Sequence, residues 1–208
     1  MRYSTRELVY IAVFGAVWGA LEMSLGSLLH VLNVPQAGTI MAAVGIVVLL
    51  TGHTFVPRRE GGHGVPPVLM MGLTTAFIKM FSLGGIVINP MLAIIMEALL
   101  VHLGLRLGRG GRKAFLLAGV MGSSWNFVHP FITQGLLAGW GAARVYRWLV
   151  FGGAKLFGLP AGYGWLIFVL LLGLKVAAGL AAGYTGWEVS RAVHQRRGVR
   201  GWRLEVGG

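Results

Sequence analysis

The chain has 208 residues, of which 56% are hydrophobic and only 12% are charged, and it contains no cysteine. So little polar surface cannot cover a soluble globule, and the absence of cysteine and aspartate excludes disulfides, thiolate chemistry and aspartate-rich magnesium motifs. The net charge of +12 is typical of the cytoplasmic loops of a membrane protein and does not require nucleic acid. We therefore expect an integral membrane protein.

Hydropathy and helix breakers predict an all-α membrane protein, a compact bundle of six transmembrane helices in a single domain over residues 1–208. The six spans are expected at about 7–31, 37–55, 67–83, 89–107, 114–140 and 164–189. The first span follows Arg2 and Arg6 but is too long for the apolar segment of a signal peptide, so we expect a retained helix.

The segment at residues 141–163 differs from these spans. It combines Arg144, Arg147 and Lys155 with aromatic residues at helical spacing, and it is then interrupted by glycines and Pro160. Because it is short and charged for a span, we expect a short interfacial helix and loop between the fifth and sixth spans. A seventh crossing is the alternative.

The cations of the connecting segments fall mostly on one side of the bilayer. With the N-terminus inside, thirteen Lys and Arg residues lie in the cytoplasm, and only Arg144, Arg147 and Lys155 lie outside. The positive-inside rule therefore predicts a multi-pass protein of the cell membrane with both termini cytoplasmic.

Four ionisable side chains lie inside the apolar spans, namely Glu22, Lys79, Glu97 and Lys175. A charge at bilayer depth is costly, which makes each of them a candidate for a functional site. At ~1.5 Å per residue, the first three share one level in the outer half of the bilayer. Lys175 comes out slightly deeper, and we interpret it as a structural counter-ion.

The fifth span carries the densest polar cluster, which includes Trp125, Asn126 and His129. Asn126 and His129 lie three residues apart on one helix face, at the level of the three charges. Pro130 frees a backbone carbonyl near Asn126 and predicts a kink. A small planar ligand could stack on Trp125 while the neighbouring polar groups bind its edge.

Together these side chains predict a cavity open to the outside with a polar floor. Its substrate-binding residues are expected to be Glu22, Lys79, Glu97, Trp125, Asn126 and His129. The alternative is that the acids pair with the lysines and lock the helices together without any ligand.

The histidines do not predict a metal or haem centre. His30 and His129 lie near the outer face and His102 near the inner face, and no two of the three have the i, i+4 spacing of a helical metal site. No metal and no other cofactor is therefore expected. His53 and His63 are assigned to the cytoplasmic connector, where we expect them to face water.

Small residues recur every four positions on the two terminal helices. Ala12, Ala16 and Ala20 form one stripe on the first helix, beside Gly15 and Gly19. The sixth span has a similar stripe of Ala178, Ala182 and Gly186 beside Gly179 and Gly183. Such stripes allow close helix approach, so they pack the terminal helices together or contact an external membrane partner.

The size, the six spans, the Ala12, Ala16 and Ala20 stripe and the polar residues of the outer half resemble the substrate-binding S components of energy-coupling factor (ECF) transporters. The resemblance implies capture of a vitamin or vitamin precursor beneath the loops at 30–36 and 141–163. It also implies docking of the alanine stripe on a transmembrane coupling subunit driven by two ATPases. The histidine motif of nickel and cobalt members is absent at Met1-Arg2-Tyr3, and the chain has no nucleotide-binding loop.

The leading hypothesis is therefore a substrate-binding subunit, not an enzyme, for a planar or zwitterionic nutrient such as a thiamin-like or pyrimidine-like compound. A second hypothesis is an intramembrane enzyme with His129 as base and Ser123 or Ser124 as nucleophile, although Ser123 lies six positions from His129. A third is a proton-coupled carrier or small channel that uses Glu22 and Glu97 as relay carboxylates.

Overall fold

The computed structural model describes residues 3–56, 65–81 and 88–196. Within these ranges the chain forms helices and no strand, which confirms the all-helical fold class. The α-helices are α1 (Thr5–Leu21), α2 (Ser27–Val31), α3 (Ala37–Phe55), α4 (Pro67–Lys79), α5 (Ile88–Leu107), α6 (Gly111–Pro130), α7 (Ala142–Phe157) and α8 (Gly164–Arg196). Two π-helical segments, η1 (Glu22–Gly26) and η2 (Phe131–Leu137), continue α1 and α6, and a 3₁₀ turn, η3 (Ala161–Tyr163), precedes α8.

The described helices have the length and composition of a membrane protein. Four segments are long and apolar enough to cross a bilayer: Thr5–Leu29, Ala37–Phe55, Ile88–Leu107 and Ala161–Gln195. Helix α4 is apolar but has only 13 residues. Helix α6 has 20 residues, but its polar run keeps it outside this group.

Each predicted span overlaps a helix, although α8 continues to Arg196, seven residues past the predicted end, and the number of six spans stays a prediction. The bounds of α3 are those predicted, and α5 begins one residue earlier than expected. The first span is divided by the π turn that begins at Glu22, and the fifth continues past Pro130 as η2. The end of the third predicted span, 82–83, lies outside the described residues.

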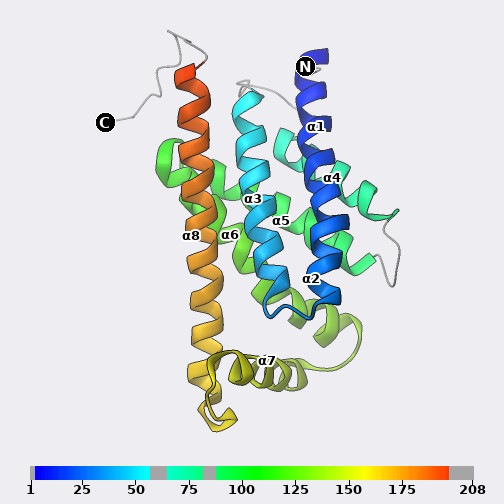
Figure 1. Cartoon of the computed structure of the whole chain (residues 1–208), viewed down its shortest axis with the longest axis vertical. Helices are drawn as coiled ribbons and strands as arrows, with labels where there is room; N and C mark the ends of the chain where they lie inside the picture. The colour runs from blue at the N-terminus through cyan, green and yellow to red at the C-terminus, as the bar shows by residue number, and fades with distance from the viewer. Residues whose placement is uncertain (1–2, 57–64, 82–87, 197–208) are drawn as a thin grey trace.

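The helices form a bundle in which α3 lies between the two terminal helices (Figure 1). Helix α1 packs on α4 and α3, α8 packs on α6 and α3, and α5 lies between α4 and α6. The start of α1 and the end of α8 lie at the same end of the bundle (Figure 1). The buried core between these helices is apolar and includes Trp18, Ile46 and Met71.

Helix α7 lies across the opposite end of the bundle, not along it (Figure 1). It buries Val145 and Val150 against α8 and η2, while Arg147, Trp148 and Phe151 are exposed. A cationic and aromatic outer face is typical of a helix that lies in the membrane interface. With α7 included, the described residues hold seven helices of 13 residues or more.

The glycines of the two terminal helices pack against different neighbours. A Cβ atom on Gly15 would lie 2.7 Å from Thr74 Cβ, so the glycine face of α1 is fitted to α4. A Cβ atom on Gly179 would lie 2.5 Å from the carbonyl oxygen of Gly119, so the glycine face of α8 is fitted to α6. The stripes therefore do not pack α1 and α8 together, which was one of the two expectations. Ala12, Ala16 and Ala20 lie on the exposed face of α1.

Candidate functional site

The first part of the candidate site is an interhelical pair between Glu22 and Lys79. Lys79 Nζ donates a hydrogen bond to the backbone oxygen of Glu22 at 2.9 Å and lies 3.8 Å from Glu22 Oε2. Both side chains are mostly buried, with exposed fractions of 15% and 13%. Glu22 is the first residue of the π segment η1, and π turns inside helices occur frequently at functional sites. The carboxylate that pairs with Lys79 is therefore that of Glu22.

Glu97 and Asn126 form the second part, one helix further into the bundle. Glu97 on α5 is 6% exposed, and the Asn126 side chain on α6 lies close enough to interact with its carboxyl group. The Glu22 carboxyl group is also near enough to act on Glu97 electrostatically. Even so, Glu97 Oε1 and Asn126 Nδ2 are buried without a partner at full hydrogen-bond geometry. Four of the predicted site residues therefore share one level.

Trp125 and His129 form the third part, on the last turns of α6. Their rings meet edge to face with centroids 5.6 Å apart. The His129 ring is hydrogen-bonded to the backbone of Asn89 at the start of α5. Trp125 Nε1, His129 Nε2 and Asn89 Oδ1 are buried and have no hydrogen-bond partner. Asn89 was predicted only as the first residue of the fourth span, so it was not among the expected site residues.

Lys175 on α8 is 8% exposed and has only neutral partners. Its ammonium group donates to Gln36 Oε1 at 2.6 Å and to the hydroxyl group of Thr39, both at the start of α3. No carboxylate of the described residues forms an ion pair with it. The expectation that Lys175 is a structural counter-ion is therefore wrong.

The first turn of α3 lies close both to Lys175 and to Asn126. Gln36 caps α3 in a left-handed conformation with φ of 61°, which places its amide near Lys175. A Cβ atom on Gly38, two residues later, would lie 3.7 Å from Asn126 Oδ1. The lysine of α8 and the asparagine of α6 thus meet the same turn of α3 from two sides.

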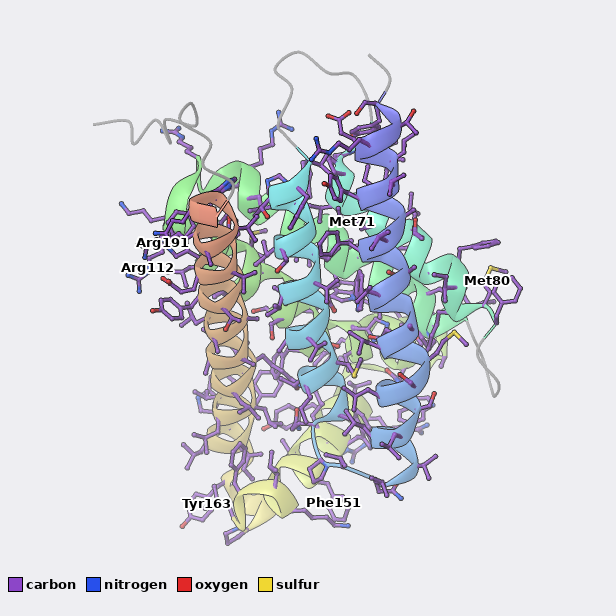
Figure 2. All side chains as sticks on the ribbon, turned by 45° about the horizontal axis from the view of Figure 1, so that its top comes forward. Met71, Met80, Arg112, Phe151, Tyr163 and Arg191 are labelled. Atoms are coloured by element: carbon purple, nitrogen blue, oxygen red, sulfur yellow. The ribbon has the colours of Figure 1, made fainter. Side chains whose placement is uncertain are left out.

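The cavities of the structure that we describe lie at the two ends of the bundle. One of about 440 Å³ lies between α7 and the start of α8, where Phe151 and Tyr163 project (Figure 2). The other, of about 350 Å³, lies between α3, α6 and α8 at the end of the bundle where α8 ends. His53 lies in the last turn of α3 and lines this second cavity, so its assignment to the connector is wrong. His63 lies outside the described residues. The predicted cavity above Glu22 and Asn126 stays a prediction.

The cluster offers hydrogen-bonding capacity that the protein itself leaves unused. Buried polar atoms are nearly always hydrogen-bonded in folded proteins, because an unmade bond costs roughly 1–3 kcal/mol. Here five such atoms on α5 and α6 have no partner. Two are oxygen acceptors, Asn89 Oδ1 and Glu97 Oε1, and three are the nitrogen atoms Trp125 Nε1, Asn126 Nδ2 and His129 Nε2. Metal binding finds no support, because the described residues contain no cluster of three His, Asp or Glu side chains that could hold an ion. A small polar ligand would satisfy the unpaired atoms.

Comparison of the chain with known proteins found no match. Neither a family model, nor a curated protein sequence, nor a solved structure matches the chain.

Proposed function

We propose that the chain is the substrate-binding subunit of an ECF-type uptake system, with six membrane spans and both termini in the cytoplasm. In this proposal it captures a vitamin or vitamin precursor from the outer side of the cell membrane. A separate coupling subunit and two ATPases would drive release into the cell. The chain itself would carry no cofactor and catalyse no reaction.

The observation that carries the proposal is the set of unpartnered buried atoms on α5 and α6. Glu97 Oε1 can accept a hydrogen bond, Asn126 Nδ2 and Trp125 Nε1 can donate one, and His129 Nε2 can do either. In a purely structural polar cluster such atoms are usually hydrogen-bonded to protein groups or to ordered water, whereas here only the Asn126 side chain lies close to the Glu97 carboxyl group. Their mixed chemistry favours a ligand with donors and acceptors along one edge, such as an aminopyrimidine.

The distribution of charge supports a ligand with two kinds of polar group. Glu22 and Lys79 neutralise each other at 3.8 Å. This leaves one buried acid, Glu97, and one buried base, Lys175, that make no ion pair within the described part of the chain. Unpaired charges in a low-dielectric interior are unfavourable. A zwitterionic or amphoteric nutrient would supply a partner for each.

The exposed face of α1 supports the proposed docking on a coupling subunit. Ala12, Ala16 and Ala20 point away from the bundle, whereas Gly15 and Gly19 on the adjacent face are covered by α4. A flat surface of small side chains allows a second membrane helix to approach closely. In the proposed complex, this face holds the coupling subunit while the ligand site faces α5 and α6.

Identification of a bound small molecule tests the proposal. We expect the chain, purified alone, to retain a polar small molecule that mass spectrometry detects after denaturation. The variant Asn126→Ala should lose it, because the variant removes the unpaired amide that faces Glu97. Val128→Ala is the matched control, since Val128 is exposed two residues further along the same helix. Equal retention by both variants would count against the proposal.

A proton-coupled carrier is a second candidate, and one observation favours it. The carboxyl groups of Glu22 and Glu97 lie near enough to influence each other, as successive groups of a proton relay must. Proteoliposomes with an internal pH dye would test this function. A carrier acidifies them when substrate is added, whereas a binding subunit alone does not.

The hypothesis of an intramembrane enzyme with Ser123 as nucleophile loses support. The Ser123 hydroxyl already donates a hydrogen bond to the backbone oxygen of Lys175 at 2.8 Å.

A further inference from the structure

The cavity at the end of the bundle where α1 starts and α8 ends is independent of the site proposed above. It has a volume of about 350 Å³ and lies between the end of α3, the start of α6 and the end of α8. This size falls in the range of ~300–1,000 Å³ typical of small-molecule sites. Phe115 and Trp187, whose rings meet edge to face at 5.5 Å, form its aromatic wall.

The polar lining of this cavity is basic. His53, Arg191 and His194 line it, and none of the described residues that line it is acidic. Arg112, at the start of α6, lies over the ring of Tyr184 at 5.1 Å and adds a further cation beside α8. Figure 2 shows Arg112 and Arg191 at this end of the bundle. Arg191 also forms an ion pair with Glu188 at 3.4 Å, and both side chains of this pair are exposed to solvent.

The start of α6 adds backbone donors to the same cavity. Gly110 and Gly111 line the cavity and have positive φ angles of 101° and 64°. The N-cap residue Gly110 has no side chain to cap the helix, so the first amide groups of α6 have no side-chain acceptor there. Open space lies over both glycines, since an added Cβ atom would meet nothing within 4 Å. Free amides and the helix dipole favour an anion at such a position.

Ser190 provides an observation that does not depend on the helix terminus. It is only 3% exposed, it lines the cavity, and its hydroxyl group makes no hydrogen bond to any described residue. The other buried hydroxyl groups of the described residues, those of Thr39, Thr75, Ser123 and Thr133, all donate a hydrogen bond to an oxygen. The Ser190 hydroxyl at the cavity wall is therefore free to donate a hydrogen bond to a ligand in the cavity.

The position along α8 relates the cavity to the membrane surface. Ser190 lies about 39 Å along the helix from Gly164, at ~1.5 Å per residue. A bilayer has a hydrocarbon core of ~30 Å and measures ~40–45 Å with its headgroups. If α8 enters the membrane beside α7, the cavity lies in the headgroup layer of the opposite leaflet.

We propose that this cavity binds a phosphate ester, with the phosphate group held by Arg191, the Ser190 hydroxyl and the first amides of α6, and the remainder of the ligand against Trp187. The headgroup of an anionic phospholipid in the adjacent leaflet and a soluble phosphate ester share this chemistry. Arginine and helix N-termini are the groups that proteins use most for phosphate oxygens.

Native mass spectrometry of the purified full-length chain tests the site with three probes. Phosphatidylglycerol carries the phosphate on acyl chains, dioleoylglycerol has the same kind of chains without phosphate, and glycerol phosphate has the phosphate without chains. We expect phosphatidylglycerol to bind at least about tenfold more tightly than dioleoylglycerol, as a charge-assisted hydrogen bond allows. Binding of glycerol phosphate with the same sensitivity to the variants below upholds the phosphate site and assigns it to a soluble ester.

Three variants separate this cavity from general electrostatic attraction. Arg191→Gln should weaken phosphatidylglycerol binding about tenfold, and Ser190→Ala, which changes no charge, roughly threefold. Lys113→Gln removes an equal charge from the first turn of α6 at a residue that does not line the cavity, and it should change binding less than about twofold. Equal losses in Arg191→Gln and Lys113→Gln, tight binding of dioleoylglycerol, or no binding of either phosphate probe would overturn the proposal.

Discussion

Lys79 binds Glu22 at two points, through the backbone oxygen at 2.9 Å and near the carboxylate at 3.8 Å. The contact joins the end of α4 to the π turn that follows α1, and it connects residues 57 positions apart in the chain. One buried charge is thereby neutralised within the bundle. The neighbouring acid, Glu97, lies close to the Asn126 side chain and makes no ion pair with a described residue.

The first prediction concerns this pair. Lys79→Met leaves the Glu22 carboxylate unpaired inside the bundle, so the single variant should lower the thermal stability in detergent. The double variant Glu22→Gln with Lys79→Met should recover part of the loss, because no unpaired charge remains. A double-mutant cycle from thermal unfolding curves should give a coupling energy of about 1–2 kcal/mol. A coupling energy near zero would show that the pair does not hold α1 to α4.

The second prediction concerns the contact between α6 and α8. Gly179→Ala places a Cβ atom 2.5 Å from the carbonyl oxygen of Gly119, and backbone cannot yield as a flexible side chain can. We expect a loss of stability of about 1–3 kcal/mol, measured as a lower melting temperature in detergent. Gly173→Ala is the matched control on the same helix, since an added Cβ atom there meets nothing within 4 Å. An equal effect of both variants would contradict the packing described.

The third prediction separates the two faces of α1. Gly15→Ala brings a Cβ atom to 2.7 Å from Thr74 and 2.9 Å from the backbone oxygen of Met71, so it should destabilise the isolated chain. Ala16→Leu lies on the exposed face, so it should leave the fold and ligand binding intact but abolish co-purification with a coupling subunit. Loss of ligand binding in Ala16→Leu would contradict separate docking and ligand faces.

The fourth prediction concerns Lys175. Lys175→Met keeps the length of the side chain but removes the ammonium group that donates to Gln36 and Thr39. Thr39 can still donate to Gln36, as it does at 3.0 Å, so the fold should survive. Binding of an anionic nutrient should weaken about tenfold or more, in line with a charge-assisted hydrogen bond. Calorimetric titration of a carboxylate-bearing vitamin and its amide measures the difference, and equal losses for both would contradict the role of Lys175.

Much of the fold could be predicted from the sequence because apolar length and helix breakers act locally. Pro35 and the polar connector after Phe55 bound α3 where the structure has it. The π turn at Glu22 has no comparable local signal, because its helix continues on both sides as an apolar segment. Pro130 did indicate an irregularity, and η2 begins at the next residue.

The site could be predicted only in part, since depth along a helix does not say which helices are neighbours. Depth counting placed Glu22, Lys79, Glu97 and Asn126 at one level, and the structure brings these four together. The same counting gave Lys175 an acidic partner because it could not foresee that Gln36 turns toward α8. The basic cavity was missed, although Trp187, Ser190, Arg191 and His194 occupy one face of α8 at helical spacing.

The most direct test of the central claim is a fluorescence titration of the purified chain with candidate vitamins, among them thiamin and its pyrimidine precursor. Trp125 lies edge to face with His129 at 5.6 Å, so a ligand bound there should quench tryptophan emission. We predict saturable quenching by one nutrient, weakened about tenfold or more in Glu97→Gln and Asn126→Ala and unchanged in Val128→Ala. No saturable quenching by any candidate, or equal affinity in all three variants, would contradict a ligand site between α5 and α6.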